Sequence, residues 1–216
     1  MNLFYQTYGN GAKMPFVMPY SEDGINFKRI RPILFFVLME TGIAGVPLMR
    51  RFASSKVKYY LYFATRDKDF KIQMQGVAVA PGDTDFSRDD WKLAIDEAIL
   101  YPELTWEGEC IEGASIAKKN GKLFMFYAGA YNNAPQQVGV AVSKDGIHWE
   151  RLFDKPFMPN GKPGEWNSCE SGHPHLFTDL DGRTYLFYQG NNDYGKTWLI
   201  TNVEVFWKKG KPYLKK

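Results

Sequence analysis

Residues 110–129 read CIEGASIAKKNGKLFMFYAG. Small residues precede a polar turn at Asn120-Gly121, and an aromatic run follows it. Asn-Gly between two such runs is a strong β-hairpin signal, so the segment predicts two antiparallel strands. Glu112 then falls within the first strand, where a carboxylate is either a structural group or a working acid.

The aromatic run recurs along the chain. Copies are visible at residues 3–6, 59–63, 123–127 and 185–189. Residues 21–29 and 143–151 share a Ser, an Asp-Gly-Ile and an Arg at the same spacing, and a Gly-Val-Ala-Val run occurs at both 76–79 and 139–142. Repeated short strands separated by turn signals predict an all-β fold, a β-propeller with about four blade repeats in a single domain over residues 1–216.

Charge and hydropathy exclude several kinds of partner. Lys and Arg number 27 against 24 Asp and Glu, and the basic residues are spread out except near the C-terminus, which gives no electrostatic basis for binding nucleic acid. The chain contains neither an apolar stretch long enough to cross a bilayer nor a signal-peptide layout, so we expect no membrane partner, while the compartment, cytoplasmic or extracytoplasmic, stays open. The two cysteines, Cys110 and Cys169, either pair or stay free.

Polar side chains on the innermost strand of each blade should converge on the central channel. Glu112 lies nine residues before Gly121, and His173 lies nine residues before Gly182. Counting back from these hairpin glycines predicts that Glu112 and His173 hold the same channel position in successive blades.

At this point residues 110–129 and 171–190 resemble the third and fourth blades of the five-bladed propeller glycoside hydrolases of family 43, which include arabinofuranosidases and xylosidases. The likeness covers most of the chain from Lys58 onward. It implies a hydrolase that inverts configuration while removing terminal arabinofuranosyl or xylosyl residues from plant-type oligosaccharides or polysaccharides. Glu112 would be the general acid, and Gly172-His173 matches a Gly-His beside the family's site. The resemblance implies no required cofactor and, in some members, a calcium ion in the channel.

Glycosidic cleavage needs one carboxylic acid to protonate the departing oxygen and one carboxylate to activate water or attack carbon. Glu109 is the main rival of Glu112 as the acid, and strand alternation places the two on opposite sides. Aromatic rings and polar side chains near the channel are expected to contact the sugar, although each alone is more often packing or turn chemistry. These candidates are His173, Trp106, Trp166, Tyr131, Asn132, Asn167 and Glu170. His173 and His175 are too few for a metal site by themselves.

Two partner carboxylates of the family pattern are not found where expected. Aligning Lys58 with Lys122 places the counterpart of Glu112 near Leu48, where there is no acid, and the base position falls before Met1. We therefore expect an incomplete first blade, with the base supplied by a missing N-terminal strand. Residues 31–54 show no strand alternation, and we interpret them, with residues 14–19, as translated from a shifted reading frame.

The alternative is an inactive or carbohydrate-binding propeller remnant that lacks the catalytic Asp residues. A third, weaker interpretation is a propeller that binds another protein. Two further channel carboxylates would distinguish the enzyme from the remnant, and a protein-binding propeller would bind a partner and show no affinity for any pentose.

Overall fold

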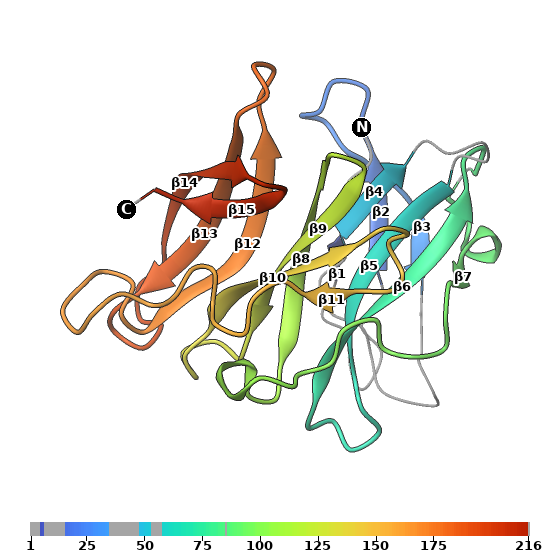
Figure 1. Ribbon diagram of the computed structural model, residues 1–216. Coiled ribbons are helices and arrows are strands. Elements are labelled where there is room, and N and C mark those ends of the chain that lie inside the picture. Colours follow the sequence, from blue (N-terminus) through green and yellow to red (C-terminus); the bar gives the residue numbers. More distant parts are fainter. Residues whose placement is uncertain (1–4, 7–15, 35–47, 53–57, 85, 216) are drawn as a thin grey trace. The chain divides into compact units, whose positions relative to one another are not determined.

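The computed structural model describes residues 5–6, 16–34, 48–52, 58–84 and 86–215, and the chain divides into two compact units, residues 1–100 and 101–216 (Figure 1). Each unit is described by itself. The described elements are β-strands and two short 3-10 helices, Arg88–Asp90 and Thr105–Glu107, without an α-helix among them. The prediction of an all-β fold is confirmed. Neither described helix has the length and apolar character needed to span a bilayer.

The first unit contains two antiparallel sheets whose strands are neighbours in sequence order. The core of the four-stranded sheet comes from aromatic, aliphatic and small residues. The buried cluster of the four-stranded sheet consists of Leu61, Phe63, Ala78, Ala80 and Trp91. The strands are β1 (Tyr5–Gln6), β2 (Phe16–Tyr20) and β3 (Lys28–Leu34) in one sheet and β4 (Leu48–Phe52), β5 (Lys58–Arg66), β6 (Gln73–Pro81) and β7 (Lys92–Leu93) in the other.

The second unit contains two four-stranded antiparallel sheets that lie side by side (Figure 1). The first sheet is β8 (Ile111–Lys119), β9 (Lys122–Gly129), β10 (Gln137–Ser143) and β11 (Glu150–Arg151). The second sheet is β12 (Glu170–Thr178), β13 (Thr184–Asn191), β14 (Leu199–Lys208) and β15 (Lys211–Leu214).

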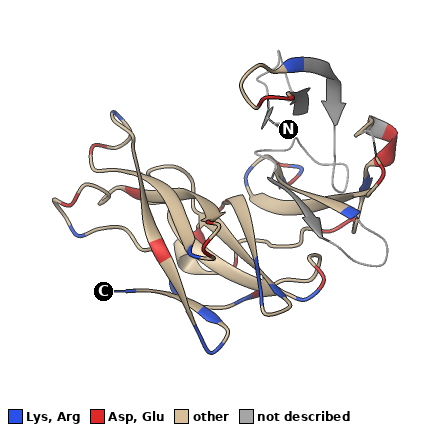
Figure 2. Cartoon of the chain, turned by 90° about the horizontal axis from the view of Figure 1, so that it is seen from above, with Lys and Arg blue, Asp and Glu red and all other residues tan. Residues whose placement is uncertain are grey.

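One buried apolar layer belongs to both sheets of the second unit. Phe126 and Val140 from the first sheet share it with Leu186 and Val205 from the second. Removing such side chains from water supplies most of the stability of the unit. Acidic and basic residues are interspersed along the described chain (Figure 2).

The repeated Asp-Gly turns have the same local structure in both units. In each, the Ser hydroxyl donates to the Asp carboxylate, which accepts the backbone N–H of the following Ile, as seen for Ser143, Asp145 and Ile147 and for Ser21, Asp23 and Ile25. Burial opposes the shift, but hydrogen bonds from His148, Ile147 and Ser143 hold the pKa of Asp145 well below its usual range. The repeat read from the sequence is therefore a structural repeat as well.

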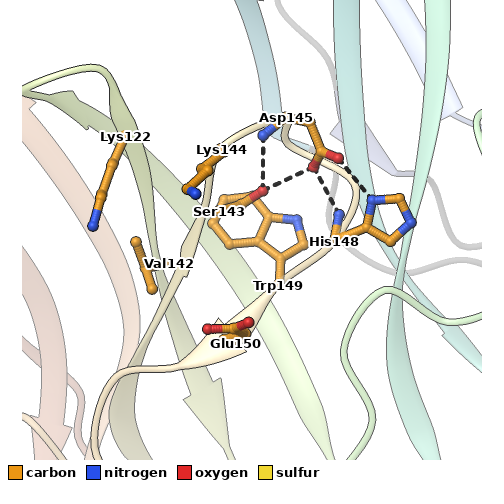
Figure 3. A pocket seen from close by; sticks show the side chains of 8 residues that line it. All are labelled: Lys122, Val142, Ser143, Lys144, Asp145, His148, Trp149 and Glu150. Atoms are coloured by element: carbon orange, nitrogen blue, oxygen red, sulfur yellow. Dashed lines mark hydrogen bonds and ion pairs between the residues drawn. The ribbon is translucent and has the colours of Figure 1, made fainter.

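A pocket of about 300 Å³ lies beside the second of these turns. Figure 3 shows Asp145 bonded to Ser143 and His148, with the indole of Trp149 close by. The Trp149 Nε1–H donates to the Gly146 carbonyl at 3.1 Å, so the ring completes the turn.

Part of the anomalous stretch forms regular structure. Leu48–Phe52 is strand β4 and pairs with β5, where the sequence indicated no strand. Leu48 lies opposite Tyr62, whereas Glu112 lies opposite Ala128, whose counterpart in β5 is Ala64. Leu48 is therefore not the counterpart of Glu112. The count failed because more residues separate Phe52 from Lys58 than separate β8 from β9, which are joined by a two-residue turn. The position opposite Ala64 lies outside the described residues, as do residues 35–47 and 53–54 of the anomalous stretch and residues 14 and 15.

Candidate active site

Strands β8 and β12 carry the same irregularity at the same place. The regular pairing of β8 is interrupted between Glu112 and Ser115, and that of β12 between Gly172 and His175. The first residue of each interruption has a positive φ, 62° at Gly113 and 46° at His173. A β-bulge of this kind bends the strand and redirects the side chains around it.

The strand register corrects the predicted equivalence of Glu112 and His173. Glu112 pairs with Ala128, and Gly172 pairs with Gln189 at the corresponding place in the second sheet. The counterpart of Glu112 is thus Gly172, so the prediction that His173 shares its position was wrong. The turn after β12 is one residue longer than Asn120-Gly121, since Asp179 N–H bonds to the Arg183 carbonyl, and counting from the glycines is therefore off by one.

The bulges nevertheless bring Glu112 and His173 together. His173 Nε2 lies 3.1 Å from Glu112 Oε1, with side-chain exposures of 34% and 17%. Both groups are thus partly shielded but still reach solvent. A carboxylate in such a place can exchange a proton with a bound molecule, which a fully enclosed structural carboxylate cannot do.

A buried glutamine, Gln136, and a half-buried one, Gln189, bind the carboxylates near this pair. Gln136 Nε2 donates to Glu112 Oε1 at 2.7 Å, and Gln189 Nε2 donates to Glu170 Oε1 at 2.8 Å. Glu170 is fully buried, and its Oε2 accepts the Asn133 backbone N–H at 2.8 Å. His173 interacts with Glu112, with Gln189 and with the charge of Glu170, so the two carboxylates and His173 form one polar network.

The network shifts the protonation of its members. Burial opposes protonation of His173, but the hydrogen bond and charge of Glu112, with smaller contributions from Gln189 and Glu170, raise its pKa above the ordinary value. For Glu170, burial has the opposite effect and raises the pKa, and the charge of Glu112 adds to the rise. The hydrogen bonds from Gln189 and Asn133 and the charge of His173 act against it, but the pKa of Glu170 stays above its ordinary value. Perturbed titrating groups in one cluster are characteristic of functional sites.

Two predicted aromatic residues pack inside the sheets. Trp106 stacks on Tyr127 with ring centroids 6.0 Å apart, and Trp166 lies 5.7 Å from Tyr188. Each indole also covers a glycine at or next to the end of the neighbouring strand, Gly129 for Trp106 and Gly190 for Trp166, where a Cβ would come within 2.5 and 2.7 Å of the ring. The two residues are equivalent parts of the two sheets, and sugar stacking by either stays a prediction.

The remaining predicted residues are dispersed around the network. Asn167 is buried and donates to the Ser171 hydroxyl at 2.8 Å, whereas Asn132 is exposed and Tyr131 is half-buried. Glu109, the rival acid, is exposed. His175 is exposed on β12. Of the predicted residues, Glu112, His173 and Glu170 are the ones that the structure joins in one network.

The sequence analysis missed Gln136, Gln189 and Glu107. Glutamine at a strand end carries no motif, so the first two had no signal beyond their place beside repeat strands. Glu107 is fully buried, and both of its oxygens bind Arg151, at 2.8 and 2.7 Å. Burial acts against ionisation of Glu107, but the bonds from Arg151 and the backbone of 103–104 keep its pKa below the usual range. This ion pair fastens β11 to the segment before β8.

Within the part of the chain that the structure describes, no three side chains of His, Cys, Asp or Glu are arranged to hold an ion. Cys110 and Cys169 are both thiols rather than halves of a disulfide.

Comparison with known proteins places this geometry in a family. The family model for glycosyl hydrolases family 43 matches residues 52–212. A β-1,2-mannobiose phosphorylase of Thermoanaerobacter sp. (strain X514) is 31% identical over 127 residues, which are 52% of this chain and 40% of that relative. The chain therefore matches well under half of this curated relative's length.

Solved structures show the same fold. A thermostable family-43 glycoside hydrolase superposes with a TM-score of 0.73 at 19% identity, over 99% of this chain and 70% of that one. An α-L-arabinofuranosidase from Lactobacillus brevis gives 0.69 at 16% identity, over 92% and 64%. These likenesses establish a fold of the kind used by propeller glycosidases. Since the family model covers more than half of the sequence, the chain belongs to glycosyl hydrolase family 43.

Proposed function

We propose that this chain cleaves glycosidic bonds with Glu112 as the general acid, releasing terminal arabinofuranosyl or xylosyl residues from plant-type glycans. The observation that carries the proposal is the contact of a partly exposed carboxylate, Glu112, with His173 inside a network that holds a second carboxylate. Membership of a glycosidase family supports a carbohydrate substrate.

In the proposed reaction Glu112 gives its proton to the glycosidic oxygen as the bond from that oxygen to the sugar's anomeric carbon breaks. The electron pair of that bond leaves with the departing sugar, and water adds to the anomeric carbon after losing a proton to a base. The raised pKa of His173 keeps a cation beside the carboxylate that Glu112 becomes. Once Glu112 has given up its proton, its negative charge in turn favours the charged form of His173.

Glu170 is a poor candidate for the base in this scheme. It is fully buried, and each of its oxygens already accepts a hydrogen bond. A base must lie within hydrogen-bond reach of the attacking water. We propose that the base comes from the part of the fold outside the described residues, in keeping with the first-blade Asp that the family resemblance implies.

A second candidate function is action on β-1,2-linked mannosides. It is favoured by the sequence similarity to the β-1,2-mannobiose phosphorylase, which is higher than the identity to the arabinofuranosidase structure. In phosphorolysis, inorganic phosphate takes the place of water and its oxygen forms the new bond to the anomeric carbon. The same Glu112 proton would serve the leaving oxygen in either reaction.

The test is a substrate panel with the protein as it exists. It contains aryl α-L-arabinofuranosides, aryl β-D-xylosides and β-1,2-mannobiose, each with and without inorganic phosphate. Turnover of the pentosides without phosphate supports the first proposal, and phosphate-dependent turnover of mannobiose supports the second. Sugar binding by calorimetry without turnover would support a binding remnant instead.

The acid is tested by Glu112→Gln, with Glu109→Gln as the matched control. Loss of a general acid lowers kcat by about 10²- to 10⁴-fold, and less for aryl leaving groups that need no proton. Glu109→Gln should keep near-normal activity, because that side chain is exposed. Equal activity of Glu112→Gln and the parent on poor leaving groups contradicts the assignment.

A further inference from the structure

Gln136 occupies a central place in the network, although it is sealed from solvent. Its side chain is fully buried, and its amide nitrogen donates to Glu112 Oε1 at 2.7 Å and to the Ala130 carbonyl at 3.0 Å. Its amide oxygen accepts the backbone N–H of His173 at 3.1 Å. One amide thus holds the carboxylate of Glu112 and the backbone of His173 at the same time.

The second strand is shaped around this amide. A Cβ on Gly172 would lie 1.9 Å from Gln136 Oε1, so β12 approaches closely enough only because residue 172 is glycine. Ser171 N–H also donates to the Gln136 carbonyl at 3.0 Å. Side chain and backbone of Gln136 therefore both fasten the start of β12.

His173 adopts a backbone conformation that it would not choose alone. Its φ of 46° lies in the left-handed region, which is unfavourable for a residue with a side chain. The hydrogen bond to Gln136 Oε1 offsets part of that cost. It also fixes the direction from which the imidazole reaches Glu112.

We infer that Gln136 is a positioning residue that sets the proton-donating geometry of Glu112, by holding its carboxylate directly and by holding His173 against it. The inference rests on the proposed role of Glu112 as the acid. Gln136 is enclosed and reaches the substrate only through these two residues. A misplacement of about 1 Å at a reacting group can lower a rate by about 100-fold.

Two variants separate the contact of Gln136 with Glu112 from its contact with His173. Gln136→Met keeps the volume but removes both the donor to Glu112 and the acceptor for His173. Gln136→Glu keeps an oxygen for the His173 N–H and, when ionised, no longer donates to Glu112. Gln137→Met is the matched control, because this neighbour's side chain bonds to the Asn160 backbone, at 3.3 Å, away from the network.

The first readout is the pKa of the His173 ring, followed by NMR of the intact chain. The charged groups facing the ring are Glu112 and Glu170. We expect the ring pKa to fall in Gln136→Met, because the ring is no longer held on Glu112, and to rise in Gln136→Glu, because a carboxylate is added. Gln137→Met should leave it unchanged. An unchanged ring pKa in a folded Gln136→Met overturns the inference.

The second readout is kinetic, on whichever substrate the panel identifies. Gln136→Met should lower kcat by about 10- to 100-fold with little change in KM and should shift the pH profile. If Gln136→Met does not fold, the isosteric Gln136→Glu decides: an unchanged ring pKa and pH profile overturn the inference. The NMR readout needs no turnover, so failure of the positioning role and failure of the proposed function remain distinguishable.

Discussion

The two sheets of the second unit have the same construction but differ near the start of their first strands, β8 and β12. In both, a tryptophan covers a glycine and packs against a tyrosine, and in both the first strand bulges at the same place. At the position before the bulge, however, the first sheet has Glu112 and the second has Gly172. Inside the bulge the pattern is reversed, with Gly113 in the first sheet and His173 in the second.

This exchange explains how two sheets with the same strand pairing contribute different side chains to one site. A side chain at position 172 would collide with Gln136, so the glycine there lets β12 approach Gln136 closely. The bulge then delivers His173 to Glu112 from the neighbouring strand. The contact between Glu112 and His173 thus depends on differences at two successive positions of two repeats that share their strand pairing and their bulges.

The largest expected effect on stability concerns the contacts of the segments that precede the first strand of each sheet. In the first sheet Glu107 is bound by Arg151, whereas the equivalent residue of the second, Asn167, makes a neutral hydrogen bond to Ser171. Arg151→Met should lower the free energy of unfolding by about 3–5 kcal/mol, because it leaves a buried carboxylate without its partner. Urea denaturation measures this change.

The control is Arg183→Met, which removes an exposed pair with Asp181. Exposed ion pairs contribute little because water screens them, so this variant should unfold at nearly the parent urea concentration. Similar losses in both variants would show that the first sheet is not held by its buried pair.

The next largest effect tests the requirement for glycine at position 172, where the first sheet has Glu112. Gly172→Ala places a methyl group 1.9 Å from Gln136 Oε1 and should cost about 1–3 kcal/mol of stability as the strand and the amide move apart. The His173 ring should then lose contact with Glu112, which the ring's NMR pKa reports. Ser168→Ala, a change in the half-buried loop before β12, serves as a control expected to have little effect. A parent-like stability for Gly172→Ala would contradict the close approach.

The smallest effect is the pH dependence contributed by His173. Its pKa is raised in the folded chain, so its stabilising contribution is full below the ordinary value of about 6.5 and is lost as pH rises through the folded pKa. The difference in unfolding free energy between the parent and His173→Gln should therefore be larger at pH 6 than at pH 9. Glu112→Gln should abolish most of that pH dependence, because Glu112 is the main group that raises the pKa. Equal differences at the two pH values would contradict the pairing.

Local patterns accounted for the strands and turns. The Asn120-Gly121 hairpin, the aromatic runs at 59–63, 123–127 and 185–189 and the Ser-x-Asp-Gly-Ile turns formed as expected, because each depends on contacts within a few residues. Register across repeats could not be read by counting. It depends on turn length, which differs by one residue after β12 and by more between β4 and β5.

The sequence by itself determined an all-β fold of repeated antiparallel sheets and singled out Glu112 as the acid to test, because strand alternation, turn chemistry and the pattern around Glu112 are all local. Only the tertiary structure decided that Gly172 is the counterpart of Glu112, that His173 reaches it from a bulge, and that Gln136 holds both. These contacts join residues up to 61 positions apart. Their distances are set by the packing of one sheet against the next, which no short stretch of sequence encodes.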